Sequence, residues 1–129
     1  MKEISIRTTS RTQLVNITTE VASALAELDP AASLCHVWVP HTTAAVVVNE
    51  AADPDVARDL AAAYRAMVPN IRFAHAEGNS DSHLLATLLG SSITAPVDGG
   101  RLRLGTWQGI FFVELDGPRS RRVWVSTHR

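Results

Sequence analysis

Two apolar, β-branched runs flank a Pro-His break in Ser33-Leu34-Cys35-His36-Val37-Trp38-Val39-Pro40-His41-Thr42-Thr43-Ala44-Ala45-Val46-Val47-Val48. Valine and threonine favour extended backbone, so residues 33–39 and 42–48 are each predicted to form a strand. Proline has no N–H to donate to a sheet and therefore interrupts the pairing. The two strands should be joined at Pro40-His41 by a bend, a bulge or a tight hairpin.

The N-terminal side adds two strands and a helix. Residues 2–9 alternate polar and apolar side chains and predict a strand, and residues 11–17 are a second candidate. Thr18 or Thr19 can cap the helix that follows, because apolar residues recur there at helical spacing until Asp29-Pro30.

The C-terminal side begins with helices and ends in strands. Asp53-Pro54 predicts the start of a helix that ends near Pro69, because proline suits the first helical position. A shorter helix is predicted over residues 83–89, with Asp81 or Ser82 as its cap. Further strands are predicted at residues 93–97, 101–104, 110–115 and 121–126.

Strands therefore outnumber helices, and most of their connections are typical of antiparallel pairing. The predicted fold class is α+β, with a β-sandwich-like, mostly antiparallel sheet core and two or three helices. A chain of 129 residues has the size of one domain, which we expect to span residues 1–129.

The composition excludes several classes of protein. The net charge of −1 predicts no nucleic-acid partner. No apolar stretch is long enough to span a bilayer, and the N-terminus has no apolar block typical of a signal peptide. Cys35 is the only cysteine, which rules out an internal disulfide and is typical of a reducing compartment. We therefore expect a cytoplasmic protein with no membrane partner.

A dense group of metal-ligand side chains occupies residues 73–83. His75 and His83 are candidate metal ligands, and Glu77 and Asn79 lie between them. Neutral imidazole and carboxylate suit zinc, and other divalent ions less selectively. The two histidines can share a metal only if the loop reverses, which Gly78 allows. The alternative is a polar surface loop that runs into a helix.

A second group surrounds the strand at residues 42–48. His41 follows a proline, where a side chain can be aimed into a cleft, and Thr42 comes next. Asn49-Glu50 follows the strand, where polar residues often face a site. Asp53 is a further candidate, although a carboxylate there is equally typical of a helix cap.

A third group lies near the C-terminus. Gly105-Thr106-Trp107-Gln108 interrupts two strand halves and sets an aromatic face beside hydroxyl and amide groups, which suits a flat heterocycle or a subunit contact. Core packing is the alternative for Trp107. Arg119 and Arg121 suit phosphate oxygens, because guanidinium binds them in a bidentate manner. The alternative is that they form ion pairs with Glu114 and Asp116, two carboxylates on one face of a strand that could otherwise be metal ligands or an acid/base pair.

These three groups together resemble the YjbQ-like family, also known as the secondary thiamine-phosphate synthase family. The resemblance is carried by residues 41–45, 49–54, 75–79, 88–92 and 105–110, with His83, Arg119 and Arg121. It covers essentially the whole chain. It implies a homotrimer of α+β subunits with sites at or near the subunit boundaries.

The resemblance also implies an activity. In a thiamine-phosphate synthase-type transferase, a hydroxymethylpyrimidine diphosphate is joined to a thiazole phosphate and diphosphate is released. A divalent metal ion, zinc or magnesium, near His75, Glu77 and His83 would screen the diphosphate. Arg119 and Arg121 would bind phosphate oxygens.

Two alternatives remain open. In a zinc-dependent hydrolase of a small phosphate or ester, His41, His75 and His83 would hold zinc, and Glu77 or Glu50 would activate water. In a non-catalytic trimeric protein, the polar groups would bind a small anion. The predicted catalytic residues are His41, Glu50, Asp53 and Glu77, and His75 and His83 are the predicted metal ligands. The residues predicted to bind a small phosphorylated substrate are Thr42, Asn49, Asn79, Thr106, Trp107, Gln108, Arg119 and Arg121.

Overall fold

The computed structural model describes residues 1–129 and contains eight strands and three helices. In chain order these are β1 (Lys2–Arg7), β2 (Gln13–Asn16), α1 (Thr18–Ala26), β3 (Leu34–Trp38), β4 (Ala44–Glu50), α2 (Pro54–Ala66), α3 (Ser80–Leu89), β5 (Ser92–Asp98), β6 (Arg101–Leu102), β7 (Gln108–Glu114) and β8 (Ser120–His128).

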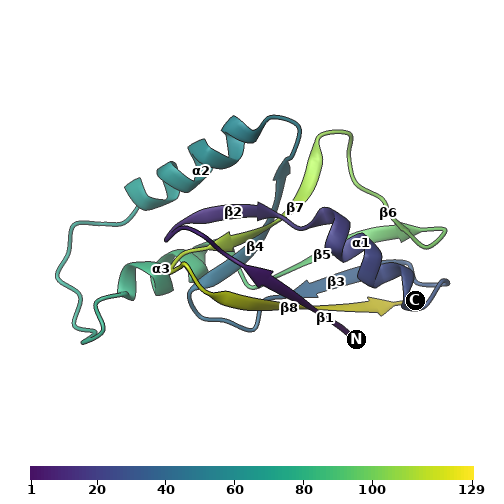
Figure 1. Cartoon of the computed structure of the whole chain (residues 1–129), viewed down its shortest axis with the longest axis horizontal. Helices are drawn as coiled ribbons and strands as arrows, with labels where there is room; N and C mark the ends of the chain where they lie inside the picture. The colour runs from purple at the N-terminus through teal and green to yellow at the C-terminus, as the bar shows by residue number, and fades with distance from the viewer.

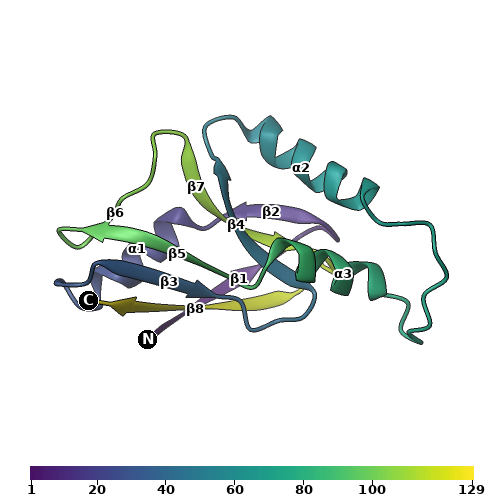
Figure 2. The same cartoon turned by 180° about the vertical axis from the view of Figure 1, so that it is seen from behind.

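The strands form two sheets, and every pair of neighbouring strands is antiparallel (Figure 1). The larger sheet has the order β1-β8-β3-β5-β6, and the smaller one has the order β2-β7-β4. The predicted α+β class with a mostly antiparallel core is therefore confirmed. The view from behind shows α3 beside β4, with which it is in contact (Figure 2).

The Pro40-His41 break is a crossing between the two sheets. β3 belongs to the larger sheet and β4 to the smaller one, so residues 39–43 carry the chain from one to the other. The predicted tight hairpin or bulge is not formed, because β3 pairs with β5 and β8 whereas β4 pairs with β7. The crossing sets His41 and Thr42 at the end of the molecule where the sheets meet.

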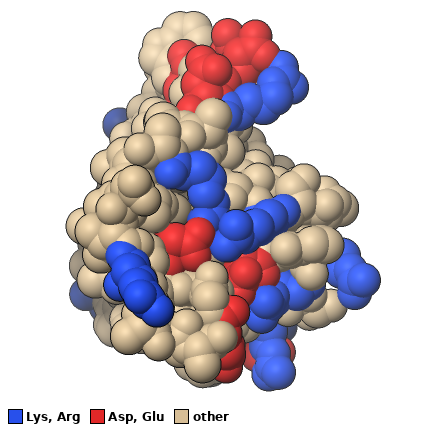
Figure 3. All heavy atoms as spheres, turned by 90° about the vertical axis from the view of Figure 1, so that its left-hand side faces the viewer, with Lys and Arg blue, Asp and Glu red and all other residues tan.

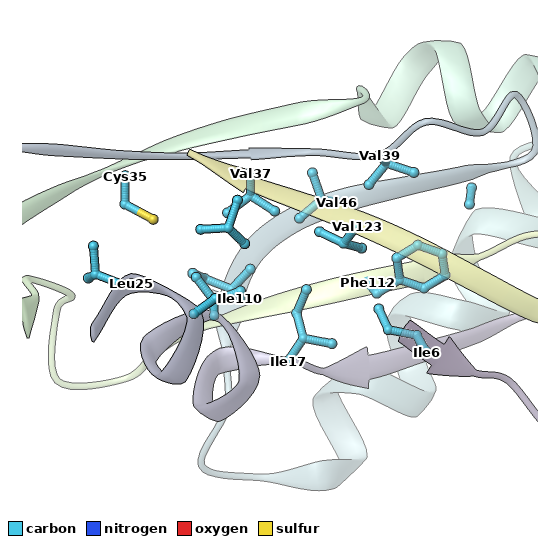
Figure 4. Packing of buried hydrophobic residues seen from close by; sticks show 14 of the residues in the cluster. Ile6, Ile17, Leu25, Cys35, Val37, Val39, Val46, Ile110, Phe112 and Val123 are labelled. Carbon is cyan, nitrogen blue, oxygen red and sulfur yellow. The ribbon is translucent and has the colours of Figure 1, made fainter. Parts of the chain in front are cut away.

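The main core fills the space between the sheets. Fifteen buried apolar residues form this cluster, and Phe112 and Ile110 of β7 are completely enclosed by it (Figure 4). Ile17 and Val21 come from the start of α1, which packs against β1, β8 and β6. Burying a side chain of this size contributes about 1.5–3 kcal/mol.

A second, smaller cluster lies on the outer face of the smaller sheet. Val113 and Leu115 pack there against Leu85 of α3, so β7 is buried on both faces. Tyr64 of α2 packs at the edge of this cluster. The contact fixes the position of α3, which carries one of the predicted metal ligands.

The start of α3 differs from the prediction. The helix begins at Ser80, and neither Asp81 nor Ser82 caps it. The Ser82 hydroxyl instead donates a hydrogen bond to the Leu115 carbonyl over 2.6 Å, and Asp81 accepts one from Arg65 of α2 over 2.8 Å. Both side chains therefore anchor α3 to its neighbours.

The start of α1 differs as well. Ile17, not Thr18 or Thr19, holds the N-cap position. Thr18 Oγ1 donates to the side chain of Asn16 and accepts the backbone N–H of Ile110 over 2.9 Å, which ties the helix to β7. No helix in the structure has the length and apolar character needed to cross a membrane.

Candidate functional site

A polar pocket of about 380 Å³ lies where the inter-sheet crossing, the end of β7, the start of β8 and the start of α3 meet. Figure 3 looks onto this end of the molecule and shows basic and acidic side chains intermingled across the middle of the face. We call it the histidine pocket. No apolar residue lines it, and its lining consists of Thr42, Thr43, His75, Glu77, Asn79, His83, Asp116 and Arg119.

The two predicted metal ligands meet in this pocket. The ring centroids of His75 and His83 are 5.5 Å apart, and the rings meet edge to face at 68°. Gly78 has a φ of +74°, which glycine adopts without strain, and its N–H donates to the His75 carbonyl over 3.2 Å. The expected reversal of the loop therefore occurs at Gly78, and it brings His75 back beside the first turn of α3.

Within the pocket, Asn79 and Asp116 connect the histidine loop to Arg119 by hydrogen bonds. Asn79 Nδ2 donates to Asp116 Oδ2 over 3.0 Å, and Arg119 Nη2 donates to the same oxygen over 3.2 Å. Asn79 Oδ1 is enclosed and has no hydrogen-bond partner in the protein. A buried acceptor without a partner costs free energy, and a bound donor or cation would offset that cost.

A buried ion pair fixes the segments that form the pocket. Glu114 is completely buried, and its carboxylate accepts hydrogen bonds from Arg121 Nε over 2.9 Å and from Thr8 Oγ1 over 2.7 Å. Arg121 Nη2 also donates to the carbonyl and hydroxyl oxygens of Thr43, which fixes the crossing segment. Burial alone would raise the pKa of Glu114, but the hydrogen bonds from Arg121 and Thr8 outweigh it and hold the pKa below 4.5.

His41 lies beside the histidine pocket and not within it. Its Nε2 accepts the backbone N–H of Arg122 over 3.0 Å. Burial and the nearby Arg121 guanidinium lower the pKa of His41 below its ordinary value. Nowhere in the structure do three His, Cys, Asp or Glu side chains gather as a metal site, so the expected trio of His41, His75 and His83 is not assembled.

The remaining predicted site residues lie at the opposite end of β4 and β7. Glu50 pairs with Gln108 and Asn49 with Gly109, whereas Ala44 at the other end of β4 pairs with Glu114 beside the pocket. Seven extended residues separate the two ends by about 20 Å. A single chain therefore does not bring Asn49, Glu50, Thr106, Trp107 or Gln108 to the histidine pocket.

Two residues of that distant group have structural roles. Asp53 caps α2, because its Oδ1 accepts the Asp55 N–H over 2.9 Å. Gln108 Oε1 accepts the Gly105 N–H over 2.8 Å and closes the turn before β7. Trp107 is 64% exposed, which excludes core packing within one chain.

Sequence reasoning missed the supporting residues Thr8 and Thr43, whereas Glu114 was a candidate. Glu114 carried a signal, since it is a carboxylate inside the apolar run at residues 110–115. Such a residue must be paired when it is buried. Its ion pair with Arg121, which was the predicted alternative to phosphate binding by that arginine, is formed in the structure.

The comparisons with known proteins cover the whole chain. The family model described as "UPF0047 protein YjbQ-like" matches residues 2–129. The UPF0047 protein of Methanocaldococcus jannaschii is 45% identical over 121 residues, which are 93% of this chain and 88% of the relative. The UPF0047 protein YugU of Bacillus subtilis is 39% identical and covers 97% of this chain and 96% of its own length.

Solved structures give the same result. A crystal structure of an uncharacterized YjbQ/UPF0047 protein from Clostridium acetobutylicum has a TM-score of 0.94 and 42% identity, and the match covers 99% of this chain and 100% of that one. A hypothetical protein from Thermus thermophilus has a TM-score of 0.89 and 40% identity, with coverage of 99% and 100%.

These names correct the expected activity. The relatives are named as UPF0047, uncharacterized or hypothetical proteins, and none of these names supports a thiamine-phosphate synthase-type transferase. They support neither the zinc-dependent hydrolase nor the non-catalytic trimeric anion-binding protein. The family model and the full-length relatives show the family of the chain and no activity. The chain belongs to the YjbQ-like UPF0047 family.

Proposed function

We propose that the histidine pocket binds the phosphate group of a small phosphorylated molecule together with a divalent metal ion at His75 and His83. The observation that carries this proposal is the meeting of the two imidazoles, 5.5 Å apart, in a pocket without a single apolar lining residue. A purely structural loop would gain little from holding two histidine rings together at a polar surface.

The donor chemistry supports a metal ion. Imidazole nitrogen binds zinc and neighbouring transition metals, and the carboxamide oxygen of Asn79 adds an enclosed acceptor without a partner. Two imidazoles are fewer than the three protein ligands typical of a catalytic zinc site. We therefore expect an exchangeable metal ion with open positions that a phosphate oxygen can occupy. When bound, the metal would polarise that oxygen.

The opposite wall supports an oxyanion. Arg119 is about half exposed and is tethered by Asp116, which holds its guanidinium at the mouth of the pocket. The hydroxyl of Thr42 lines the same wall. Guanidinium and hydroxyl donors facing a metal ion form a combination suited to phosphate.

The metal part is tested by elemental analysis and by titration of the metal-free protein with zinc. We expect about one zinc per chain in the purified protein, and loss of zinc binding in His83→Ala with the fold retained. His36→Ala is the matched control, because His36 lies on the larger sheet beside Thr94 and outside the pocket. Equal zinc binding by His83→Ala and the control would contradict the proposal.

The phosphate part is tested by titrating inorganic phosphate with and without zinc. Because two ligands that share a site stabilise each other reciprocally, zinc should tighten phosphate binding. If the phosphate affinity is the same with and without zinc, the two ligands do not bind together in this pocket, and the joint site is contradicted. If magnesium and not zinc tightens binding, the metal ion is magnesium.

We also propose that the protein is a cytoplasmic homotrimer. Trp107, Met67 and Ile71 are large apolar side chains that are at least 60% exposed, and contact with other subunits would cover them. The location is supported by Cys35, which is buried and unpaired.

A further inference from the structure

A second hollow, of about 520 Å³, adjoins the histidine pocket on the side of the larger sheet. The two share Thr42, Thr43 and Arg119, and His41, Arg121 and Trp38 line only the second one. No carboxylate lines this hollow, although carboxylates are common elsewhere on this end of the molecule. A negative group in this hollow would therefore contact no carboxylate directly.

The hydrogen bond to the backbone determines what His41 presents to this hollow. Because Nε2 accepts the N–H of Arg122, that nitrogen must carry a lone pair, and the ring proton of the neutral imidazole is on Nδ1. Nδ1 makes no hydrogen bond within the protein and is not sealed from solvent. His41 is thus a neutral donor with one free N–H.

Arg121 presents a second free donor. Its side chain is only 3% exposed, and Nε and Nη2 are engaged by Glu114 and Thr43. Nη1 has no partner in the protein and is not enclosed, and Arg121 lines both this hollow and a neighbouring one beside Ser5 and Arg7. The guanidinium is fixed in orientation by buried partners while one nitrogen remains free for a ligand.

We propose that this hollow is an oxyanion subsite, in which the Nδ1–H of His41 and the Nη1 of Arg121 bind a carboxylate or phosphate oxygen. Arg119 at the shared rim adds positive charge, and the ring of Trp38, which is 44% exposed, provides an apolar wall for the adjoining part of the ligand. Donors that are already oriented lose little entropy on binding. The lowered pKa of His41 agrees with a neutral ring at neutral pH. The subsite goes beyond the proposed function, because it requires no metal ion.

Two substitutions of His41 test the roles of its two ring nitrogens separately. Asparagine places an amide nitrogen near the position of Nδ1, so His41→Asn retains a donor into the hollow. Glutamine places its amide near the position of Nε2, so His41→Gln retains the contact with Arg122 and loses the donor. His36→Gln is the matched control, since that histidine lies outside both pockets.

The binding test uses metal-free protein titrated with inorganic phosphate, and separately with acetate, by NMR. We expect His41→Gln to weaken binding of the preferred anion about ten-fold, and His41→Asn to keep it within about three-fold of the parent protein. The stronger of the two anions identifies the ligand group. Equal binding by His41→Gln and His36→Gln, or no binding of either anion, would overturn the subsite.

A second measurement does not depend on variants. A long-range proton–nitrogen NMR spectrum of the unmodified protein should show His41 protonated at Nδ1, and a proton at Nε2 would overturn the proposal. Neither experiment contains a metal ion. Failure here therefore leaves zinc binding at His75 and His83 intact, and failure of zinc binding leaves this subsite intact.

Discussion

The buried pair of Glu114 and Arg121 is the residue-scale feature on which the pocket depends. Its carboxylate holds the end of β1 through the following residue, Thr8, and holds β8 through Arg121, and Arg121 in turn holds the crossing segment through Thr43. Three segments that are distant in the sequence thus share one ion pair.

We expect Glu114→Gln to lower the free energy of unfolding by about 3–5 kcal/mol, because it leaves the Arg121 charge buried without its partner. Urea unfolding monitored by circular dichroism measures this. Glu27→Gln is the control, because its pair with Lys2 is solvent-exposed, and we expect little change. Similar stabilities for the two variants would show that the pair contributes nothing.

The same pair gives the stability a pH dependence of known sign. The pKa of Glu114 is lower in the folded protein than its ordinary value of 4.5. Its contribution is therefore complete above pH 4.5 and is lost as the pH falls through the folded pKa. The difference in unfolding free energy between the parent protein and Glu114→Gln should narrow below pH 4.5, and a difference that stays constant would contradict this assignment.

At the residue scale, the sequence predicted the chemical roles of side chains better than it predicted the contacts between them. The approach of His75 and His83 was predictable, because both lie close in sequence around Gly78, the glycine that allows the reversal. The pairing of Glu114 with Arg121 was predicted only as an alternative, and its burial was not predictable, since that depends on how two strands pack across the core. Pairing of that kind is set by tertiary structure and not by spacing.

At the scale of elements, the ends of β4 and β7 at Glu50 and Gln108 are separate from the histidine pocket. We call these ends the tip. It carries Trp107, whose backbone carbonyl accepts the Ala51 N–H over 2.8 Å while its ring faces solvent. The tip is therefore held by the backbone, and its aromatic side chain is free to contact another molecule.

We expect Trp107→Ala to change the unfolding free energy of the isolated chain by less than about 0.5 kcal/mol, as is usual for an exposed side chain. Phe112→Ala in the adjoining strand β7 should cost about 3–5 kcal/mol, because Phe112 is fully buried. Thermal and urea unfolding of both variants in dilute solution measure the contrast. A large loss of stability in Trp107→Ala at high protein concentration alone would place the ring at a subunit contact.

The elements themselves were largely predictable, and their starts were less so. The strand at residues 110–115 and the helix after Asp53 follow directly from apolar runs and from the Asp-Pro signal. The start of α3 was predicted wrongly because Asp81 and Ser82, which are good caps in isolation, are engaged by Arg65 and Leu115. Tertiary partners overrode the local preference.

At the scale of the whole molecule, the proposed trimer makes a direct prediction. Light scattering coupled to size-exclusion chromatography should give three times the chain mass of 13.9 kDa. Exposed apolar residues at Met67, Ile71 and Trp107 provide the area that such contacts need. A mass equal to one chain at micromolar concentration would contradict the trimer.

The fold class followed from the sequence, but the arrangement of strands did not. Alternating and β-branched runs predict strands wherever they occur, and these account for the α+β class. The separation of β3 and β4 into different sheets depends on which partners each strand finds, and β8 is a partner of both β1 and β3. Partners so distant in the chain leave no local pattern.

The position of β8 between β1 and β3 has a consequence for synthesis on the ribosome. Every other strand of the larger sheet is made before β8, so β1 and β3 cannot be bridged until Ser120–His128 has emerged. The nascent chain therefore carries unpaired strand edges and an uncovered apolar face while it is being translated. A premature stop before Ser120 would therefore yield a product that cannot close its larger sheet.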